Sequence, residues 1–172
     1  MTNILKISAA AAAPALGATP AAAQQVSPDS QARATARIVK PLSLYWVQDL
    51  DLGSILLGPG TWTGAVVGIA SDGTFDCANT NVTCTGDVSE AQYRVTGTNN
   101  QDVTINAHDV VLSNPNTTPA STLTLVVDNP GTINLSNSGA SGYTFGLGGS
   151  IAVNSTTPDG TYSGTFDVTV EY

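Results

Sequence analysis

The chain has 172 residues, of which 41% are apolar, which is enough for one domain with a hydrophobic core. Only 10% are charged and the formal net charge is −8, so the sequence lacks the basic surface that nucleic-acid binding requires. With one histidine and two cysteines, composition disfavours most classes of enzyme, and we predict no catalytic residue, no metal site and no cofactor.

Residues 1–23 have the pattern of a secretory signal peptide. Lys6 supplies a positive charge, Ile7 to Leu16 are apolar and mostly alanine, and Ala21–Ala23 place small residues before a cleavage point. Interrupting prolines and a glycine disfavour the alternative, an alanine-rich first helix. The stretch is also too short to span a membrane. We expect cleavage after Ala23, export through the inner membrane to the periplasm, and then a cell-surface or extracellular location without a membrane span.

The mature chain divides by sequence into a flexible arm over 24–33 and a single domain over 34–172. Apolar residues alternate with polar ones, and turn clusters such as Gly58-Pro59-Gly60 recur at short intervals. The predicted strands are Ala34–Lys40, Leu42–Val47, Leu50–Leu57, Trp62–Ile69, Gln92–Thr96, Val103–Ala107, Val110–Leu112, Thr122–Val127, Tyr143–Val153 and Thr161–Tyr172. Many short strands with regular turns predict an all-β antiparallel sandwich or barrel. The glycine-rich tract at 142–150 calls for a bulge, a bend or a close neighbour in its strand.

Cys77 and Cys84 frame six residues without a nearby histidine or further cysteine. A metal site needs more ligands, and a redox pair usually has two intervening residues. In an oxidising compartment this spacing favours a structural disulfide.

The C-terminal segment carries the clearest pattern in the chain, a period-two alternation over 13 residues. One face of this predicted strand consists of Gly160, Tyr162, Gly164, Phe166, Val168, Val170 and Tyr172. The other face is polar. The pattern itself indicates a strand built into a sheet, and a use of this strand in assembly is what the resemblance described next implies.

This last strand resembles the end of chaperone–usher pilus subunits, in which a glycine precedes a near-terminal aromatic residue by twelve positions. Gly160 and Tyr172 keep that spacing, although pilus subunits usually carry one more residue after the aromatic one. The wider chain resembles a domain family of unknown function, found in secreted bacterial proteins, that is related to spore coat protein U and to those pilins. Its marks are A-T-A-x-I-V-x-P-L-x-L from Ala34, D-L-D-L-G from Asp49, A-x-Y-x-V-T-G from Ala91 and the closing P-D-G-T-Y-S-G-T-F-D-V-T-V-E-Y from Pro158.

The resemblance implies an immunoglobulin-like, pilin-like sandwich with an incomplete strand that a neighbour's extension completes. It also implies partners: copies of the chain or related subunits, a periplasmic chaperone and an outer-membrane usher. The candidate donor arm consists of Ala32, Arg33, Ala34, Ala36, Arg37 and Ile38. Its alanines and Ile38 alternate with Arg33 and Arg37. An equally open interpretation makes Ala34–Lys40 the domain's own first strand.

Charge distribution adds to the case for assembly. Three of the four cations of the mature chain lie in 24–40, whereas Pro41 onward has twelve acids and only Arg94. A basic arm and an acidic body attract each other head to tail, which builds filaments where the contact does not close.

Other sites are weaker. His108 and Asp109 are adjacent, so a strand points them to opposite faces and away from a shared catalytic site. Asp49 and Asp51 are too few for a calcium loop. Trp46 and Trp62 are candidate sugar-stacking rings, although core packing is commoner.

We therefore expect a secreted structural or adhesive subunit that assembles pilus-like filaments by strand complementation. The alternatives are a monomeric glycan-binding module and, last, a hydrolase.

Overall fold

The computed structural model describes residues 31–136 and 141–172. The chain separates into two compact units, Met1–Arg37 and Ile38–Tyr172. Within the described residues all regular structure is β, and no helix occurs. The strands are β1 Ser43–Gln48, β2 Ser54–Leu57, β3 Ala65–Ile69, β4 Phe75–Asp76, β5 Val82–Thr85, β6 Ala91–Thr96, β7 Asp102–Ala107, β8 Val110–Asn114, β9 Ser121–Asp128, β10 Thr132–Asn134, β11 Tyr143–Val153 and β12 Val168–Glu171.

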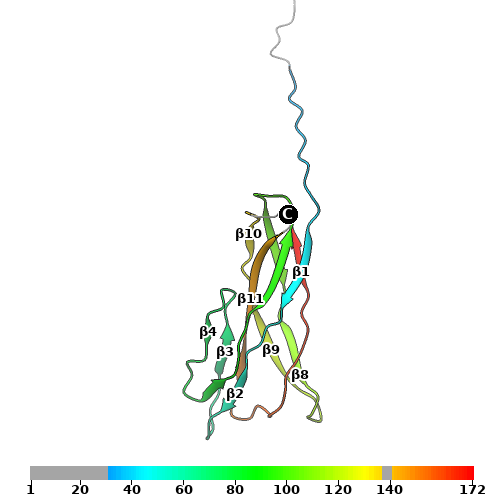
Figure 1. Cartoon of the computed structure of the whole chain (residues 1–172). Helices are drawn as coiled ribbons and strands as arrows, with labels where there is room; N and C mark the ends of the chain where they lie inside the picture. Colours follow the sequence, from blue (N-terminus) through cyan, green and yellow to red (C-terminus); the bar gives the residue numbers. More distant parts are fainter. Residues whose placement is uncertain (1–30, 137–140) are drawn as a thin grey trace, which may run out of the picture. The chain divides into compact units, whose positions relative to one another are not determined.

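Strand β11 organises the domain, as the long orange strand of Figure 1 shows. Its first half pairs with β6, and its second half pairs with both β3 and β9. One seven-stranded sheet results, in which β1, β6, β11, β3 and β4 are neighbours and β9 and β8 branch from β11. A three-stranded sheet, β10-β7-β12, and a two-stranded sheet, β2-β5, complete the described fold. All pairs are antiparallel, so the predicted antiparallel β-sandwich is confirmed.

The glycine tract of β11 has a close neighbour, as its composition predicts. A Cβ atom on Gly146 or Gly148 would strike main-chain atoms of the β3–β4 turn, Ser71 O in the first case and Ile69 O in the second. Only glycine leaves room for that approach.

Two long ladders run along the edge of the sandwich. The stretch 43–57 is antiparallel to 82–96 through β1·β6, a bridge between Asp51 and Ser89, and β2·β5. The C-terminal stretch is likewise antiparallel to β7 and β8, through β12·β7 and a bridge between Ser163 and Ser113. Each of the two stretches is paired on one side.

The core has two parts. The first cluster lies among β3, β9 and the second half of β11, with Val67, Leu125 and Ile151 at its centre. The second lies among β6, β7 and the first half of β11, and includes Val95, Ile105 and Leu147. Both contain side chains that are wholly or nearly buried. Leu50 and Phe166 touch both clusters and so join them.

The disulfide between Cys77 and Cys84 is present, as predicted. It ties the loop after β4 to β5, and both cysteines pack against the first cluster.

Three expectations need correction. The prediction of a strand over Ala34–Lys40 is wrong, because these residues form no strand and are all exposed. Their alanines offer too little apolar surface to offset the entropy lost when a strand is ordered. The strand predicted over Leu50–Leu57 begins at Ser54, and that over Thr161–Tyr172 is regular only at Val168–Glu171. The short strands β4, β5 and β10 were not expected from the pattern. The predicted signal peptide lies outside the described residues.

Candidate functional site

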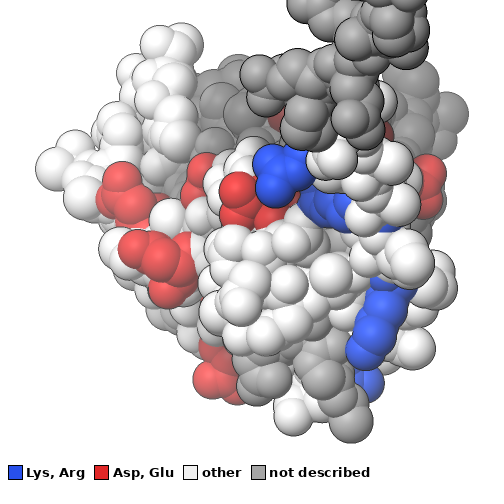
Figure 2. All heavy atoms as spheres, turned by 90° about the horizontal axis from the view of Figure 1, so that it is seen from above, with Lys and Arg blue, Asp and Glu red and all other residues white. Residues whose placement is uncertain are grey.

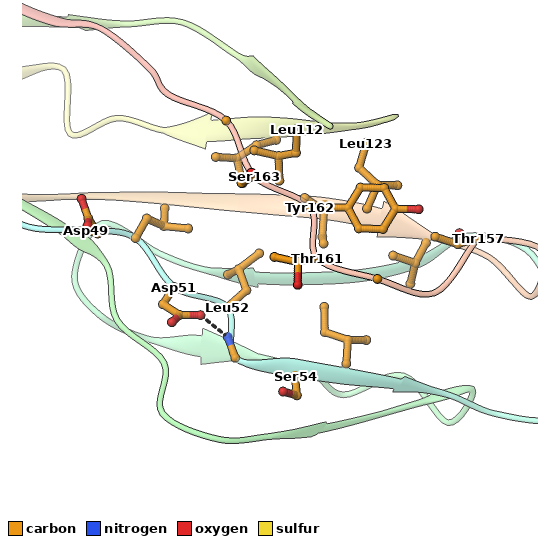
Figure 3. A pocket seen from close by; sticks show the side chains of 18 of the residues that line it. Asp49, Asp51, Leu52, Ser54, Leu112, Leu123, Thr157, Thr161, Tyr162 and Ser163 are labelled. Carbon is orange, nitrogen blue, oxygen red and sulfur yellow. Dashed lines mark hydrogen bonds between the residues drawn. The ribbon is translucent and has the colours of Figure 1, made fainter. Parts of the chain in front are cut away.

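A groove of about 950 Å³ lies between two stretches of the chain that belong to these ladders. Residues 48–57 form one wall and residues 157–166 form the other. Figure 3 shows the walls running in opposite directions, with Asp49 to Ser54 along one and Thr157 to Ser163 along the other.

The first wall has an unpaired edge. Strand β2 pairs with β5 on one side, and no other strand pairs with it among the described residues. In an antiparallel pair, alternate residues direct their N–H and C=O groups to opposite sides. Half of the backbone polar groups of β2 therefore point away from β5 without a strand to receive them.

The second wall is similar. From Thr161 to Asp167, the only residue with main-chain hydrogen bonds to the rest of the described protein is Ser163, which exchanges two with Ser113, at 2.9 and 3.1 Å. Its neighbours Tyr162 and Gly164 therefore direct their backbone groups to the other side.

Gly160 fixes the start of this wall. Its φ of +133° is a conformation that residues with a side chain rarely adopt, and a Cβ atom there would meet the amide of Asn114. Asn114 is fully buried, and its Nδ2 donates a hydrogen bond to the carbonyl oxygen of Asp159 at 2.9 Å. The segment is thereby held against the end of β8.

The floor between the walls is apolar. It consists of side chains from the two walls and from β8, β9 and β11: Leu50, Leu52, Ile55, Leu57, Leu112, Leu123, Leu125, Ile151, Val153 and Phe166. Several of them, such as Leu112 and Leu123, are only half-buried. An apolar strip of this kind, flanked by two unpaired backbone edges, has the composition of a sandwich interior that lacks one strand.

The groove is acidic and contains no cation. Asp49, Asp51 and Asp159 line it, and none of the lining residues is Lys, Arg or His. Burial raises the pKa of Tyr93 at one end of the groove, and the charges of Asp49 and Asp167 raise it further. Asp49 belongs to the first wall and Asp167 directly follows the second, and both act on the same phenol. In the view of Figure 2 the acidic side chains form separate patches on a surface that is mostly uncharged.

The predicted assembly residues line or adjoin this groove. Tyr162, Phe166, Val168 and Val170 are half-buried and the residues between them are exposed, so the alternation exists although the regular strand is short. Gly160, Tyr162, Gly164 and Phe166 are among the lining residues. Tyr172 lies beyond the groove, where its hydroxyl donates to Lys40 O at 2.6 Å and accepts from Thr98 N at 2.8 Å.

The candidate donor arm has no regular secondary structure. Ala32, Arg33, Ala34, Ala36, Arg37 and Ile38 form no strand and are exposed. Ile38 has 92% of its surface exposed, which is unusual for so large an apolar side chain.

The weaker candidates mostly have structural partners. Asp109 accepts a hydrogen bond from Val127 N, Asp51 from Gly53 N and Asp49 from the indole of Trp46. His108 is exposed. Within the described ranges, no group of three His, Cys, Asp or Glu side chains could hold a metal ion, and no helix is long and apolar enough to cross a membrane.

The two tryptophans differ. Trp62 is half-buried against the first core cluster, and its Nε1 donates to Gly58 O at 3.1 Å. Trp46 has 63% of its surface exposed.

Sequence reasoning missed the first wall. The pattern predicts a single strand over Leu50–Leu57, and Asp49 and Asp51 enter the sequence analysis only as too few ligands for calcium. The signal in the sequence is D-L-D-L-G, in which two acids interrupt the apolar run. Gly53, with φ of +69°, separates the bridged Asp51 from the start of β2.

A family model described as "Domain of unknown function (DUF4402)" matches residues 42–172. The chain belongs to this family. The match begins one residue before β1 and covers both walls of the groove. Neither a search of curated proteins nor a search of solved structures finds a match to this chain.

Proposed function

We propose that this DUF4402 protein is an exported structural or adhesive surface subunit that assembles by β-strand addition. The observation that carries the proposal is the groove, because it places two unpaired backbone edges on either side of an apolar floor. An extended segment laid in the groove would pair with β2 on one side and with Thr161–Asp167 on the other. Main-chain hydrogen bonds supply the affinity in this mode of recognition, and alternate side chains supply the specificity.

The donor in this proposal is the arm of a second copy. Ala32, Ala34, Ala36 and Ile38 fall on one face of an extended strand and would meet the apolar floor. Arg33 and Arg37 fall on the other face, where they would lie near the acidic groove lining. Because the arm is basic and the groove holds three carboxylates, each copy attracts the arm of the next.

Sequence patterns support the export and filament parts of the proposal. The signal-peptide pattern over 1–23 directs the chain to an oxidising compartment, and the Cys77–Cys84 disulfide suits that compartment. The resemblance of Gly160–Tyr172 to the last strand of pilus subunits, and of the wider chain to a family related to spore coat protein U, suggests filaments as the product. A chaperone and usher are the partners that this resemblance adds.

A deletion and a matched pair of substitutions test the proposal. The mature chain is compared with a form that lacks residues 24–37, and with Leu123→Asp and Val126→Asp. Leu123 lines the groove, whereas Val126 on the same strand is 52% exposed. Light scattering and electron microscopy should find assembly in the mature chain and in Val126→Asp, and loss of assembly in the other two.

Amide hydrogen exchange gives a second measurement that does not depend on a groove variant folding. Adding a synthetic peptide of residues 24–42 to the deleted chain should slow exchange at Ser54–Leu57 and at 161–167, because these amides gain acceptors. The proposal is wrong if the mature and deleted chains are equally stable monomers at high concentration and the peptide protects neither wall.

A monomeric glycan-binding module is the second candidate, and Trp46 is the residue that favours it. The exposed ring is oriented by the bond from its Nε1 to Asp49 Oδ1 at 3.0 Å. Trp62 gives this candidate no support, since it packs against the core. Binding on a glycan array that is lost in Trp46→Ala, by a chain that stays monomeric, would favour this function over assembly.

A further inference from the structure

Strand β1 leaves one side of the seven-stranded sheet open. Among the residues that the structure describes, it pairs only with β6, and no main-chain hydrogen bond reaches its other side. Its six residues include no charge, and three consecutive large side chains are exposed: Tyr45 by 48%, Trp46 by 63% and Val47 by 47%. Proteins normally protect such edges with charge, proline or brevity, because an open edge pairs with other chains.

Three of the other outer strands of the described sheets have that protection, whereas β2 lines the groove and β8 has a bridge to Ser163. β4 has two residues and includes Asp76, β10 has three residues, and β12 ends at the exposed Glu171. β1 is longer than each of these and is the apolar one. The one feature of β1 that could discourage edge pairing is a β-bulge between Trp46 and Gln48. The bulge bends the last residues of the strand and leaves Ser43–Trp46 regular.

The charges around β1 indicate what its partner is. The sequence from 31 to 48 contains cations and no acid, with Lys40 closest to the strand, whereas Asp49 and Asp51 follow it directly. A second copy laid antiparallel with a two-fold axis at Tyr45 places Lys40 between Asp49 and Asp51 of the other copy. A parallel copy would instead set like charges beside each other.

We propose that β1 is a homotypic interface, in which two copies pair edge to edge through Ser43–Val47 around a two-fold axis at Tyr45. The contact is isologous, so it joins copies in pairs and closes. It uses the outer edge of β1 rather than the groove, and therefore links two copies, or two strands of an assembly, side by side. Tyr45, Trp46 and Val47 of one copy then contact the side chains of the other across the paired edges, which covers part of their exposed surface.

Cysteine cross-linking tests the pairing, because both native cysteines are already in the disulfide and no other exists in the chain. In the mature chain, Tyr45→Cys should form a disulfide-linked dimer as its main product on mild oxidation. Val66→Cys is the matched control, since Val66 is 54% exposed on β3 and lies away from β1. It should give less than a tenth of that yield.

Charge reversal then tests the antiparallel direction. In the Tyr45→Cys chain, Lys40→Glu and Asp49→Lys should each lower the dimer yield at least fivefold, and the two together should restore it. Asp87→Lys, at an exposed acid on another loop, should leave the yield unchanged. Equal yields from Tyr45→Cys and Val66→Cys, or a double reversal no better than either single one, would overturn the proposal.

Adding Leu123→Asp separates this contact from strand insertion. The Tyr45→Cys dimer should persist in that variant, because the groove takes no part in the β1 contact. A dimer that disappears with Leu123→Asp would assign the cross-link to strand insertion instead and contradict the β1 pairing.

Discussion

The two halves of this sandwich share β11 and are flanked by the same two stretches of chain, 42–57 and 157–172, but they differ in how they are closed. Around the second core cluster, β1 and β12 cover Val95, Ile105 and Leu147, and Leu42, Leu44, Val168 and Val170 pack against them. Around the first cluster, the same two stretches of chain separate, and β2 and residues 159–167 leave the groove between them. The closed half ends at Tyr172, whose hydroxyl bonds both Lys40 and Thr98.

The difference shows what a strand pattern can and cannot specify. The alternation from Gly160 to Tyr172 is continuous in sequence, yet only Val168–Glu171 forms a regular strand. These four residues pair with β7 along their whole length, whereas the preceding residues have a single bridge to β8. Regular strand structure therefore requires a partner as well as a pattern. The open half is where a partner is missing.

The largest contrast between the halves should appear on truncating leucine. Leu147 is fully buried in the closed half, so Leu147→Ala should lower the free energy of unfolding by about 3 kcal/mol. Leu123 in the groove is half-buried, and Leu123→Ala should cost about 1 kcal/mol because much of its surface already meets water. Urea denaturation of both variants measures the two values. Equal costs would mean that the groove is filled in the unassembled protein.

The disulfide should stabilise the open half. Joining Cys77 to Cys84 closes a short loop, and the chain-entropy model gives about 2.5 kcal/mol for a loop of this length. Replacing both cysteines by alanine should lower the unfolding free energy by about that amount. Hydrogen exchange should rise most in β5, and so in β2, whose one partner among the described strands is β5. Faster exchange confined to β7 and β12 would contradict this assignment.

A smaller loss is expected where the second wall begins. Gly160→Ala places a Cβ atom against Asn114 in a backbone conformation unfavourable for alanine, and should cost about 2 kcal/mol. If the wall is held at Gly160, this substitution should free residues 161–166 to exchange, while exchange in β12 stays as it is in the unsubstituted chain.

The sequence specified the fold class and most strands, and it failed where pairing is long-range. Alternation alone located Tyr143–Val153 and the cysteine spacing predicted the disulfide, because both are local signals. The sequence pattern did not reveal that β11 changes partners midway, nor that 48–57 and 157–166 face each other. Hydrophobic periodicity does not depend on which strands pair, so neither fact could be read from it. The spacing of twelve residues from Tyr172 draws attention to Gly160, but the structure requires glycine there because a side chain would meet the buried Asn114 on β8. The prediction that alanines over Ala34–Lys40 form a strand failed because small side chains bury little surface.

The smallest expected effect is a change in the pKa of Tyr93, a residue that lies where the two halves meet. Tyr93 packs against the closed cluster and lines the groove, and its pKa is raised above the ordinary 10.0 by burial and then by Asp49 and Asp167. A raised pKa means that folding favours the neutral phenol, so this residue's contribution to stability falls as pH rises past 10. Asp49→Asn or Asp167→Asn should each lower the pKa of Tyr93, measured as the difference in ultraviolet titration between each variant and the same chain with Tyr93→Phe. An arm that brings Arg33 or Arg37 into the groove should also lower the pKa of Tyr93, because a cation stabilises the phenolate. If peptide 24–42 binds and the pKa of Tyr93 does not fall, the arginines lie at the other end of the groove, which fixes the direction in which the arm runs.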